Sequence, residues 1–299
     1  MDEQRAGEPA RPAAARRHAA ALARTLVRPR AYAGAAREAA IGAFSLATYP
    51  LGVRAALPQP VAYAPRQPAA RSLVALAPEV AWTPIVLVHG YFHNRSAFLS
   101  MGRGLRRAGF QYVHTMNYNP LAHDLFGLAQ QLDREIERVL DVTGAEQVQI
   151  VGHSMGGIVA RACVQLMAAD ERVDTVITLG SPHRGTHAAR FGAGPAARQL
   201  RPGSAFLRTL EETARPTAVR WISYYSDLDA MIIPANSAKL VHPALKAVNV
   251  KTRDTGHLSL LVHGEVLRGI AAHLSDPWLG RTPDTAADAS AAPALGAAG

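Results

Sequence analysis

The segment Val148-Gln149-Ile150-Val151-Gly152-His153-Ser154-Met155-Gly156-Gly157 decides the fold of this chain of 299 residues. Its first four residues form an apolar run typical of a buried strand, and residues 158–164 have the composition of a helix. Between them lies the pattern Gly-x-Ser-x-Gly, which places the serine on a cramped strand-to-helix turn with no room for neighbouring side chains. Such a turn raises the hydroxyl of Ser154 above the edge of the sheet, beside the free N–H groups of the next helix. The pattern therefore predicts a nucleophilic serine.

A second landmark lies upstream, where residues 84–91 (Pro-Ile-Val-Leu-Val-His-Gly-Tyr) predict a buried strand ending in a loop. When a serine attacks a carbonyl carbon, the negative charge that develops on the carbonyl oxygen requires two aimed backbone N–H groups. Met155 would supply one of them and Tyr91 the other, with Phe92 as the alternative to Tyr91. We expect His89 to hold this loop by hydrogen bonds, because it precedes the serine in the chain and so lies on the wrong side for the base.

The base is expected downstream of the serine. His257 follows the apolar run at 247–250 and precedes a helix-like segment, so its loop can bring the imidazole to the catalytic edge of the sheet. The chain has 12 histidines, and position along the chain is what distinguishes His257 from the others.

The acid that orients the base should lie between the serine and the histidine in the sequence. A strand-like run at 218–225 is followed by two candidate carboxylates, Asp227 and Asp229. We choose Asp229 because it leads directly into the apolar segment Met231-Ile232-Ile233-Pro234, which would hold it rigidly beneath the histidine. Asp227, one turn closer to the strand end, stays open as the alternative, in which case Asp229 is a cap or a solvated loop charge.

Five segments in this order resemble a bacterial serine lipase or esterase of the α/β-hydrolase superfamily, of triacylglycerol lipase type, over residues 84 to about 275. They are V-L-V-H-G-Y (86–91), V-G-H-S-M-G-G (151–157), T-L-G-S-P-H-R-G-T (178–186), S-D-L-D-A-M-I-I-P (226–234) and D-T-G-H-L-S-L-L (254–261). The resemblance implies an α/β fold, in which a mostly parallel sheet has helices on both faces and a short cap. It also implies ester hydrolysis through an acyl-enzyme.

The resemblance also implies roles for particular residues. Ser154 would be the nucleophile, His257 the base and then the acid, and Asp229 the group that orients the imidazole. The loop side chains Phe92, His153 and His183 are candidates for substrate contact. Three alternatives remain: an acyltransferase, a thioesterase or amidase with the same triad, and a non-catalytic binding module that kept the fold.

No metal-ligand, EF-hand or nucleotide-binding pattern occurs in the sequence, so we expect neither a metal nor another cofactor. His183 and His187 lie four residues apart, but no third ligand accompanies them, and we expect loop histidines that line a pocket. The single cysteine, Cys163, cannot form an intrachain disulfide, and we expect it to serve as a small buried apolar residue.

The net charge of +9 is concentrated at the N-terminus, because residues 1–71 hold eleven arginines and four acidic residues. Such an arm either contacts anionic lipid or has no partner at all, and the absence of interleaved aromatic residues excludes nucleic acid. The uncharged stretch 39–53 is too short to span a bilayer and contains Pro50. We expect it to lie on a membrane surface or to pack against the hydrolase domain, and therefore expect peripheral membrane contact through residues 1–57. A cytoplasmic or membrane-associated location is favoured, with secretion as the alternative.

The chain divides into an N-terminal extension (1–80), a catalytic domain (81–276) and a disordered tail (277–299). Within the extension we expect a flexible part with helical tendency at 13–27, a helix pair or amphipathic anchor at 31–57, and a linker at 58–80. In the domain we predict strands at 84–88, 111–116, 147–151, 173–179, 218–225 and 246–252. The predicted helices are 96–108, 123–141, 155–169 and 258–274. Residues 183–212 lack a strand pattern and are expected to form a partial cap, or else an ordinary connecting helix.

Overall fold

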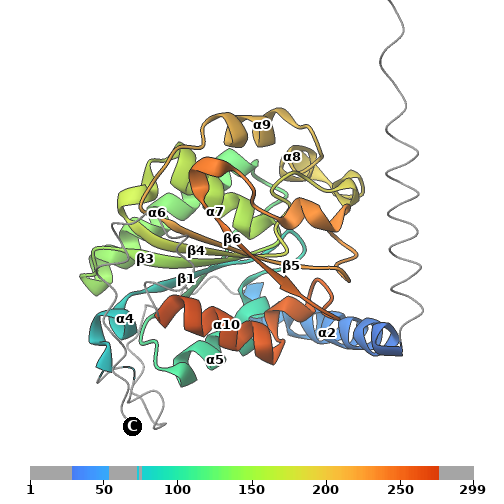
Figure 1. The fold of residues 1–299 in the computed structure, drawn as a ribbon, viewed down its shortest axis with the longest axis horizontal. Helices are drawn as coiled ribbons and strands as arrows, with labels where there is room; N and C mark the ends of the chain where they lie inside the picture. The colour runs from blue at the N-terminus through green and yellow to red at the C-terminus, as the bar shows by residue number, and fades with distance from the viewer. Residues whose placement is uncertain (1–28, 54–72, 74–75, 276–299) are drawn as a thin grey trace, which may run out of the picture.

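A parallel sheet forms the centre of the computed structural model, which describes residues 29–53, 73 and 76–275 (Figure 1). Its six strands lie in the order β2-β1-β3-β4-β5-β6, and every neighbouring pair is parallel. The strands are β1 (Ile85–Val88), β2 (Val113–Met116), β3 (Val148–His153), β4 (Val173–Leu179), β5 (Arg220–Ser226) and β6 (Val248–Thr252). This arrangement confirms the predicted α/β class.

Helices cover both faces of the sheet because its strands are apolar on both sides (Figure 1). In β1, Val86 and Val88 point into the core on the side of α6 and α7, whereas Ile85 and Leu87 point to the side of α5 and α10. The α-helices are α2 (Pro29–Val53), α4 (Pro78–Trp82), α5 (Leu99–Ala108), α6 (Leu125–Thr143), α7 (Met155–Leu166), α8 (Gly194–Gln199), α9 (Ala205–Glu212) and α10 (Gly264–Ser275). Short 3-10 segments are η1 (Arg95–Phe98), η2 (Ala169–Glu171), η3 (His187–Arg190), η4 (Ala235–Ala238), η5 (Pro243–Leu245) and η6 (Ser259–Leu261).

The strand order determines where a ligand can bind. The chain passes from β1 outward to β2 and then returns to β3 on the other side of β1. Connections therefore diverge at the carboxyl ends of β1 and β3, and a crevice opens at such a switch point in parallel sheets. The two landmark loops, after Val88 and after His153, both begin there.

All six predicted strands are confirmed within about two residues, but two helices begin differently from the prediction. The helix expected at 96–108 starts as η1 and becomes α-helical only at Leu99. The helix expected at 258–274 is wrong at its start, because η6 ends at Leu261 and a break at Val262 separates it from α10. The break allows the chain around His257 to turn toward the sheet edge before α10 packs beneath it.

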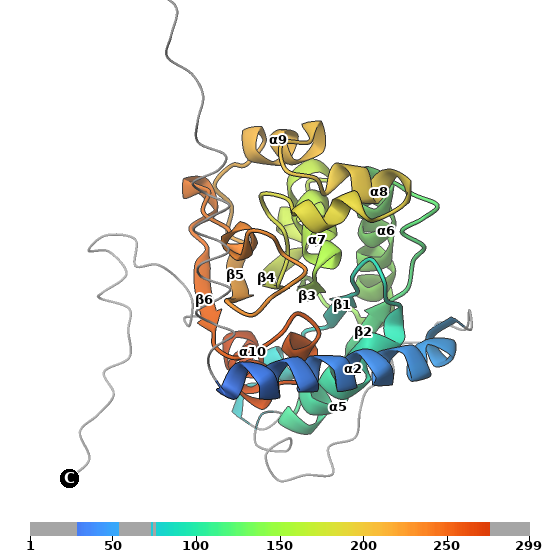
Figure 2. The same ribbon diagram turned by 90° about the vertical axis from the view of Figure 1, so that its right-hand side faces the viewer.

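Residues 183–212 form a short cap made of η3, α8 and α9 (Figure 2). Leu200, Leu207 and Leu210 are buried in the same core cluster as α6 and α7. The segment therefore packs onto the domain, as expected for a partial cap. Cys163, in α7, is buried in the same cluster, as predicted.

The N-terminal helix α2 excludes one of the two expectations for residues 31–57, a helix pair or an amphipathic anchor. Residues 29–53 form a single helix and not a helix pair, because the segment is rich in alanine and Pro50 perturbs only its last turn. Two placements were expected for this segment, on a membrane surface or against the hydrolase domain. The structure shows the second, since α2 packs against η1 and η6. Among the described residues, no helix combines the length and apolar character that crossing a bilayer requires. Predictions for 1–28, 54–72 and 277–299 lie outside the described residues.

Candidate active site

Ser154 lies on a strained turn between β3 and α7. Its backbone angles, φ 55° and ψ −123°, are costly for a residue with a side chain. The flanking glycines make the turn fit: a Cβ at Gly152 would lie 2.6 Å from the backbone of Gly157, and one at Gly156 would lie 2.1 Å from the Val88 carbonyl oxygen. The predicted elbow geometry is therefore present, with Ser154 half-buried above the start of α7.

Ser154 and His257 line the same cavity, which has a volume of about 350 Å³ and lies at the carboxyl ends of the strands. His257 is buried, and its Nδ1 lies 2.7 Å from Oδ2 of Asp229. With Nδ1–H donating to that carboxylate, the lone pair of the imidazole is on Nε2. Three residues separated by about a hundred positions are thus brought together at one edge of the sheet.

The structure brings Asp229, and not Asp227, to His257. The second oxygen of Asp229, Oδ1, accepts hydrogen bonds of 2.9 Å from the backbone N–H groups of Met231 and Ile232. These bonds hold the carboxylate in place through the apolar segment that follows it. Asp227 instead pairs with Lys251, with Oδ2 and Nζ 3.3 Å apart, and its side chain is 32% exposed.

The charges around His257 favour its protonated form. Burial alone would lower the pKa of His257, but the charge of Asp229, the hydrogen bond to it and the charge of Glu38 outweigh burial. The pKa of His257 is therefore raised above its ordinary value of 6.5. An imidazole in this position is suited to accept a proton from a neighbouring hydroxyl.

The candidate oxyanion groups come from Met155, directly after Ser154, and from the loop after β1. Met155 is the first residue of α7, so its N–H belongs to the helical turn that has no internal acceptors. Tyr91 and Phe92 line the cavity, and the hydroxyl of Tyr91 donates to the carbonyl of Ala193 in the cap. The loop after β1 is thereby attached to the cap.

His89 has the supporting role expected from its position. It is fully buried and stacks on Tyr118 with ring centroids 4.0 Å apart. Burial lowers the pKa of His89 to about 4, so the ring is neutral: Nδ1–H donates to the Gly90 carbonyl at 2.8 Å, and Nε2 accepts from the Tyr118 N–H at 3.4 Å. His89 therefore fixes the loop that carries Tyr91.

Of the three side chains expected to contact substrate, only Phe92 lines the cavity. His153 is completely buried, and its Nε2 donates to the carbonyl of His257 at 3.0 Å. Burial, together with the charges of His257 and His93, holds the pKa of His153 well below its usual value. His183 is buried as well, with Nε2 3.0 Å from the hydroxyl oxygen of Thr178.

Two titratable residues of the cavity wall escaped the sequence interpretation, His93 and Glu38. His93 follows Phe92 in the loop after β1. Glu38 comes from α2 and is the only acidic residue between positions 9 and 78. Gly34 and Gly42 lie four residues before and after Glu38, on the same face of the helix. This spacing of glycines is the sequence signal that could have indicated close contact between that face and the domain.

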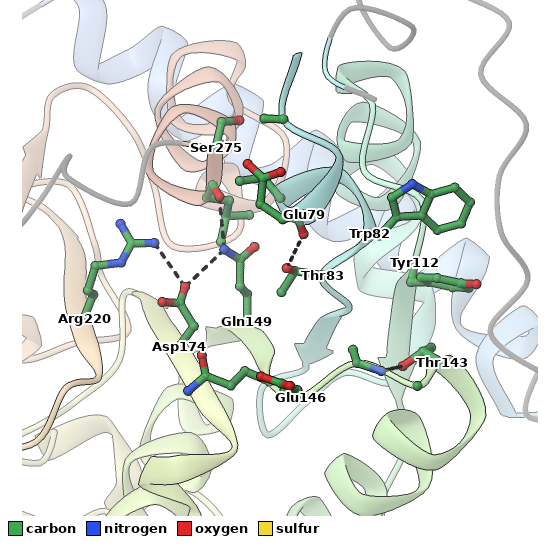
Figure 3. Close-up of a pocket in the computed structure, with 16 residues that line it drawn as sticks. Glu79, Trp82, Thr83, Tyr112, Thr143, Glu146, Gln149, Asp174, Arg220 and Ser275 are labelled. Carbon is green, nitrogen blue, oxygen red and sulfur yellow. Dashed lines mark hydrogen bonds and ion pairs between the residues drawn. The ribbon is translucent and has the colours of Figure 1, made fainter. Parts of the chain in front are cut away.

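A second cavity lies at the other end of the sheet, near the amino ends of the strands, and has a volume of about 680 Å³ (Figure 3). Its wall includes Gln149, Asp174 and Arg220, which bond to one another or to nearby backbone. None of Ser154, Asp229 and His257 lines it.

Comparison with known proteins identifies the family. Residues 84–236, just over half of the chain, match the family model described as "Palmitoyl protein thioesterase". The chain belongs to this family. The matched segment contains Ser154 and Asp229 and ends before His257, so the palmitoyl protein thioesterase match covers two of the three candidate residues.

Individual relatives agree with the predicted resemblance to lipases and esterases. A triacylglycerol lipase of Pseudarthrobacter phenanthrenivorans is 40% identical over 65 residues, which cover 22% of this chain and 20% of that lipase. A triacylglycerol lipase of Vibrio cholerae is 32% identical over 117 residues, 37% of this chain and 36% of that lipase. A lysosomal thioesterase PPT2 homolog of Drosophila melanogaster is 25% identical over 118 residues, 38% of this chain and 40% of that protein. This chain therefore spans between one fifth and two fifths of the length of these relatives.

Solved structures share the fold. The mature form of Bacillus licheniformis lipase BlEst2 has a TM-score of 0.56 at 19% identity, covering 65% of this chain and 92% of that one. Aspergillus fumigatus lipase B has a TM-score of 0.59 at 19% identity, covering 67% of this chain and 54% of that one. At these identities the likeness concerns the fold alone, and it confirms the α/β-hydrolase fold.

Proposed function

We propose that this protein is a serine hydrolase of acyl esters that works through a covalent acyl-enzyme. The observation that carries the proposal is the 2.7 Å contact between His257 Nδ1 and Asp229 Oδ2 beside a cavity that Ser154, on its strained turn, also lines. This combination supplies a nucleophile, a base and an orienting acid in the chain order Ser, Asp, His.

The reaction follows from these positions. The Oγ of Ser154 attacks the ester carbonyl carbon while Nε2 of His257 takes the hydroxyl proton, and the N–H groups of Met155 and Tyr91 stabilise the resulting oxyanion. The carbon–oxygen bond to the alcohol then breaks, and His257 gives its proton to the departing alkoxide. A water molecule attacks the acyl-serine in the same way, so that carboxylic acid leaves and Ser154 regains its proton.

The character of the cavity favours an acyl chain as the part of the substrate that is bound. Its wall includes the apolar side chains of Leu200, Leu228 and Ile232. Binding of an acyl chain to apolar surface of this kind is favourable because it removes hydrocarbon from water. The carboxylate of Glu38 in the same wall disfavours substrates with an anionic acyl group.

A thioester is the second candidate substrate. The family match and the Drosophila relative favour it, since both bear the name of thioesterases. The same residues can act on either bond, because the nucleophile and the oxyanion are unchanged and only the leaving group differs, a thiolate in place of an alkoxide.

The test compares turnover of p-nitrophenyl esters of graded chain length, and of matched acyl thioesters, by the wild type and by Ser154→Ala. Loss of a triad nucleophile costs about 10⁶-fold in rate, so Ser154→Ala should retain almost no activity. Ser275→Ala, whose hydroxyl only donates to the Ala271 carbonyl at the end of α10, is the control and should match the wild type. Equal rates for the Ser154 variant and the wild type would refute the proposal, and a clear preference for thioesters would select the second candidate.

A further inference from the structure

The N-terminal helix α2 contributes one side chain to the loop that carries His257. The carboxylate of Glu38 accepts a hydrogen bond from the backbone N–H of Leu258 and two from Ser259, at 3.0 Å from the N–H and 2.7 Å from the hydroxyl. Leu258 and Ser259 directly follow His257 and begin η6. Glu38 therefore supplies a carboxylate cap to a helical turn 220 residues away in the sequence.

The surroundings of Glu38 are shaped for close contact. A Cβ placed on Gly256 would lie 2.3 Å from Oε2, 2.5 Å from Cδ and 3.0 Å from Cγ of Glu38, so only glycine leaves room for this carboxylate. Gly34 and Gly42 lie on the same face of α2, one turn to each side. Cβ atoms there would lie 3.2 Å from Leu228 and 3.7 Å from Leu258. This face of α2 thus lies directly on the catalytic loops.

The other end of α2 is attached to the loop after β1, which carries the candidate oxyanion group. The side-chain amide of Asn94 donates to the carbonyl of Tyr49 at 2.8 Å, and that of Asn117 donates to the carbonyl of Gly52 at 3.0 Å. Asn94 also caps η1, since its Oδ1 accepts from the Ser96 N–H at 2.9 Å. Figure 2 shows α2 extending across this side of the molecule. The helix therefore bridges the two loops between which a substrate would react.

Three contacts hold the backbone and ring of His257. Asp229 binds Nδ1, His153 donates to the carbonyl oxygen, and Glu38 accepts from the two residues that follow. The first fixes the rotation of the ring, and the other two fix the two peptide units that follow His257. A misplacement of about 1 Å at a catalytic group can reduce the rate about 10²-fold, so the anchoring of this loop matters for turnover.

We infer that α2 serves the catalytic site through Glu38, a positioning residue that fixes the loop of His257 and does not itself react. This inference rests on the proposed function of Ser154 and His257 and adds a fourth residue to it. The part of the chain before the hydrolase domain then serves the chemistry and is more than a surface appendage.

The first test compares Glu38→Gln with Arg37→Gln, an exposed position on the same helix. Glutamine keeps the size of Glu38 but loses the charge and turns an NH₂ group toward N–H donors. We expect kcat to fall about tenfold to hundredfold with a smaller change in KM, and Arg37→Gln to match the wild type.

The same variants differ in their pH profiles. The groups that face His257 are Asp229, Glu38, His93 and His153, and burial keeps the two neighbouring histidines neutral by lowering their pKa values. Loss of the negative charge of Glu38 lowers the pKa of His257, so the neutral base persists to lower pH. The acidic limb of kcat/KM should therefore move to lower pH in Glu38→Gln, an effect that mere loss of helix packing would not produce.

A second test does not depend on activity. Amide hydrogen exchange at Leu258 or Ser259 should be faster in Glu38→Gln than in Arg37→Gln, because glutamine has one acceptor oxygen where the carboxylate has two, and one of the two N–H groups therefore loses its acceptor. If Glu38→Gln does not fold, Ser259→Ala removes only the hydroxyl contact and should still lower kcat about threefold.

The close contact with Gly256 permits a cycle of variants. Gly256→Ala alone should lower kcat strongly, because the new methyl group collides with Glu38. The double variant Gly256→Ala/Glu38→Ala removes the collision and should be no slower than Glu38→Ala alone. If the loss of kcat in the double variant instead equals the product of the losses in the two single variants, the residues act independently and the contact is contradicted.

The outcomes separate this inference from the proposed function. If Glu38→Gln matches Arg37→Gln in kcat, acidic limb and exchange while Ser154→Ala is inactive, Glu38 has no positioning role and the proposed function stands. If Ser154→Ala keeps full turnover, the catalytic role proposed for that serine fails and the positioning role fails with it.

Discussion

The two ends of the sheet carry cavities that differ in size and chemistry. At the carboxyl ends of the strands the cavity is about 350 Å³ and its wall is mainly apolar, with Ser154 and His257 among its few polar groups. At the amino ends the cavity is about 680 Å³, and polar and charged side chains make up much of its wall (Figure 3). Of these two cavities, the smaller one is lined by both Ser154 and His257, and the lining described for the larger one includes neither.

The polar groups at the amino ends are bonded to one another and to the backbone. Arg220 lies 3.2 Å from Asp174, and the side-chain amide of Gln149 donates to Asp174 at 3.3 Å and to the Leu274 carbonyl at 3.0 Å. These bonds connect β3, β4 and β5 to one another and to α10. At the carboxyl ends, the Asp229–His257 pair instead leaves one imidazole nitrogen for a reacting group. The pairing of the polar groups, and not the volume of the cavity, indicates where chemistry can occur.

Among the substitutions that compare the two ends, the largest effect should come from Asp229 at the carboxyl ends. Asp229→Asn should lower kcat/KM about 10³- to 10⁴-fold, because the amide favours the wrong tautomer of His257. Asp227→Asn, which loses only the pair with Lys251, should stay within a few-fold of the wild type. The acidic limb of the remaining activity should also move to lower pH, since loss of the Asp229 charge lowers the pKa of His257. Ester turnover across pH measures both effects, and a severe loss at Asp227 alone would reverse the assignment.

At the amino ends, the expected effect is on stability. Asp174→Asn takes one charged partner from Arg220, whose side chain is only 3% exposed, and should reduce the free energy of unfolding by about 2 kcal/mol. Asp170→Asn is the matched control, because its partner Arg215 is 58% exposed and the loss should stay below about 1 kcal/mol. Urea denaturation measures the difference. A large loss of kcat/KM in folded Asp174→Asn would show that the two ends are not separate in function.

The smallest effect should appear in chain-length preference. Ala188 is half-buried in the cap and lines the carboxyl-end cavity, so Ala188→Phe should fill part of the space for an acyl chain. We expect kcat/KM for long-chain esters to fall about tenfold relative to short-chain esters, which corresponds to roughly 1.4 kcal/mol. Ala205→Phe, at the exposed start of α9, should leave the ratio unchanged. An equal loss of kcat/KM for esters of every chain length would contradict this position for the acyl chain.

The sequence predicted the parts of the molecule that depend on local pattern. The strand before Gly152 and the helix after Ser154 are contiguous, so their relation follows from backbone geometry. The choice of Asp229 over Asp227 rested on the apolar residues that follow it, and the N–H groups of Met231 and Ile232 do hold its carboxylate. The orientation of individual side chains was less accessible: His153 and His183 were expected to contact substrate, but both are buried and neither lines the cavity.

Glu38 could not be assigned from pattern, because its partners lie 220 residues away and no local periodicity connects them. A single glutamate in an alanine-rich segment has the appearance of a solvated surface residue. Of the two expectations for 31–57, a helix pair or an amphipathic anchor, the structure excludes the helix pair. A proline as near the end of a helix as Pro50 leaves the preceding turns intact.

The contact between α2 and the His257 loop also bears on the order of events during synthesis. A ribosome releases the chain from its N-terminus, so residues 29–53 emerge early, long before the loop they hold exists. Until synthesis has passed Leu258 and Ser259, Glu38 lacks its partners and the cavity lacks one wall. Contacts so distant in the sequence form late in folding, so the proposed active site is completed only after both segments have emerged.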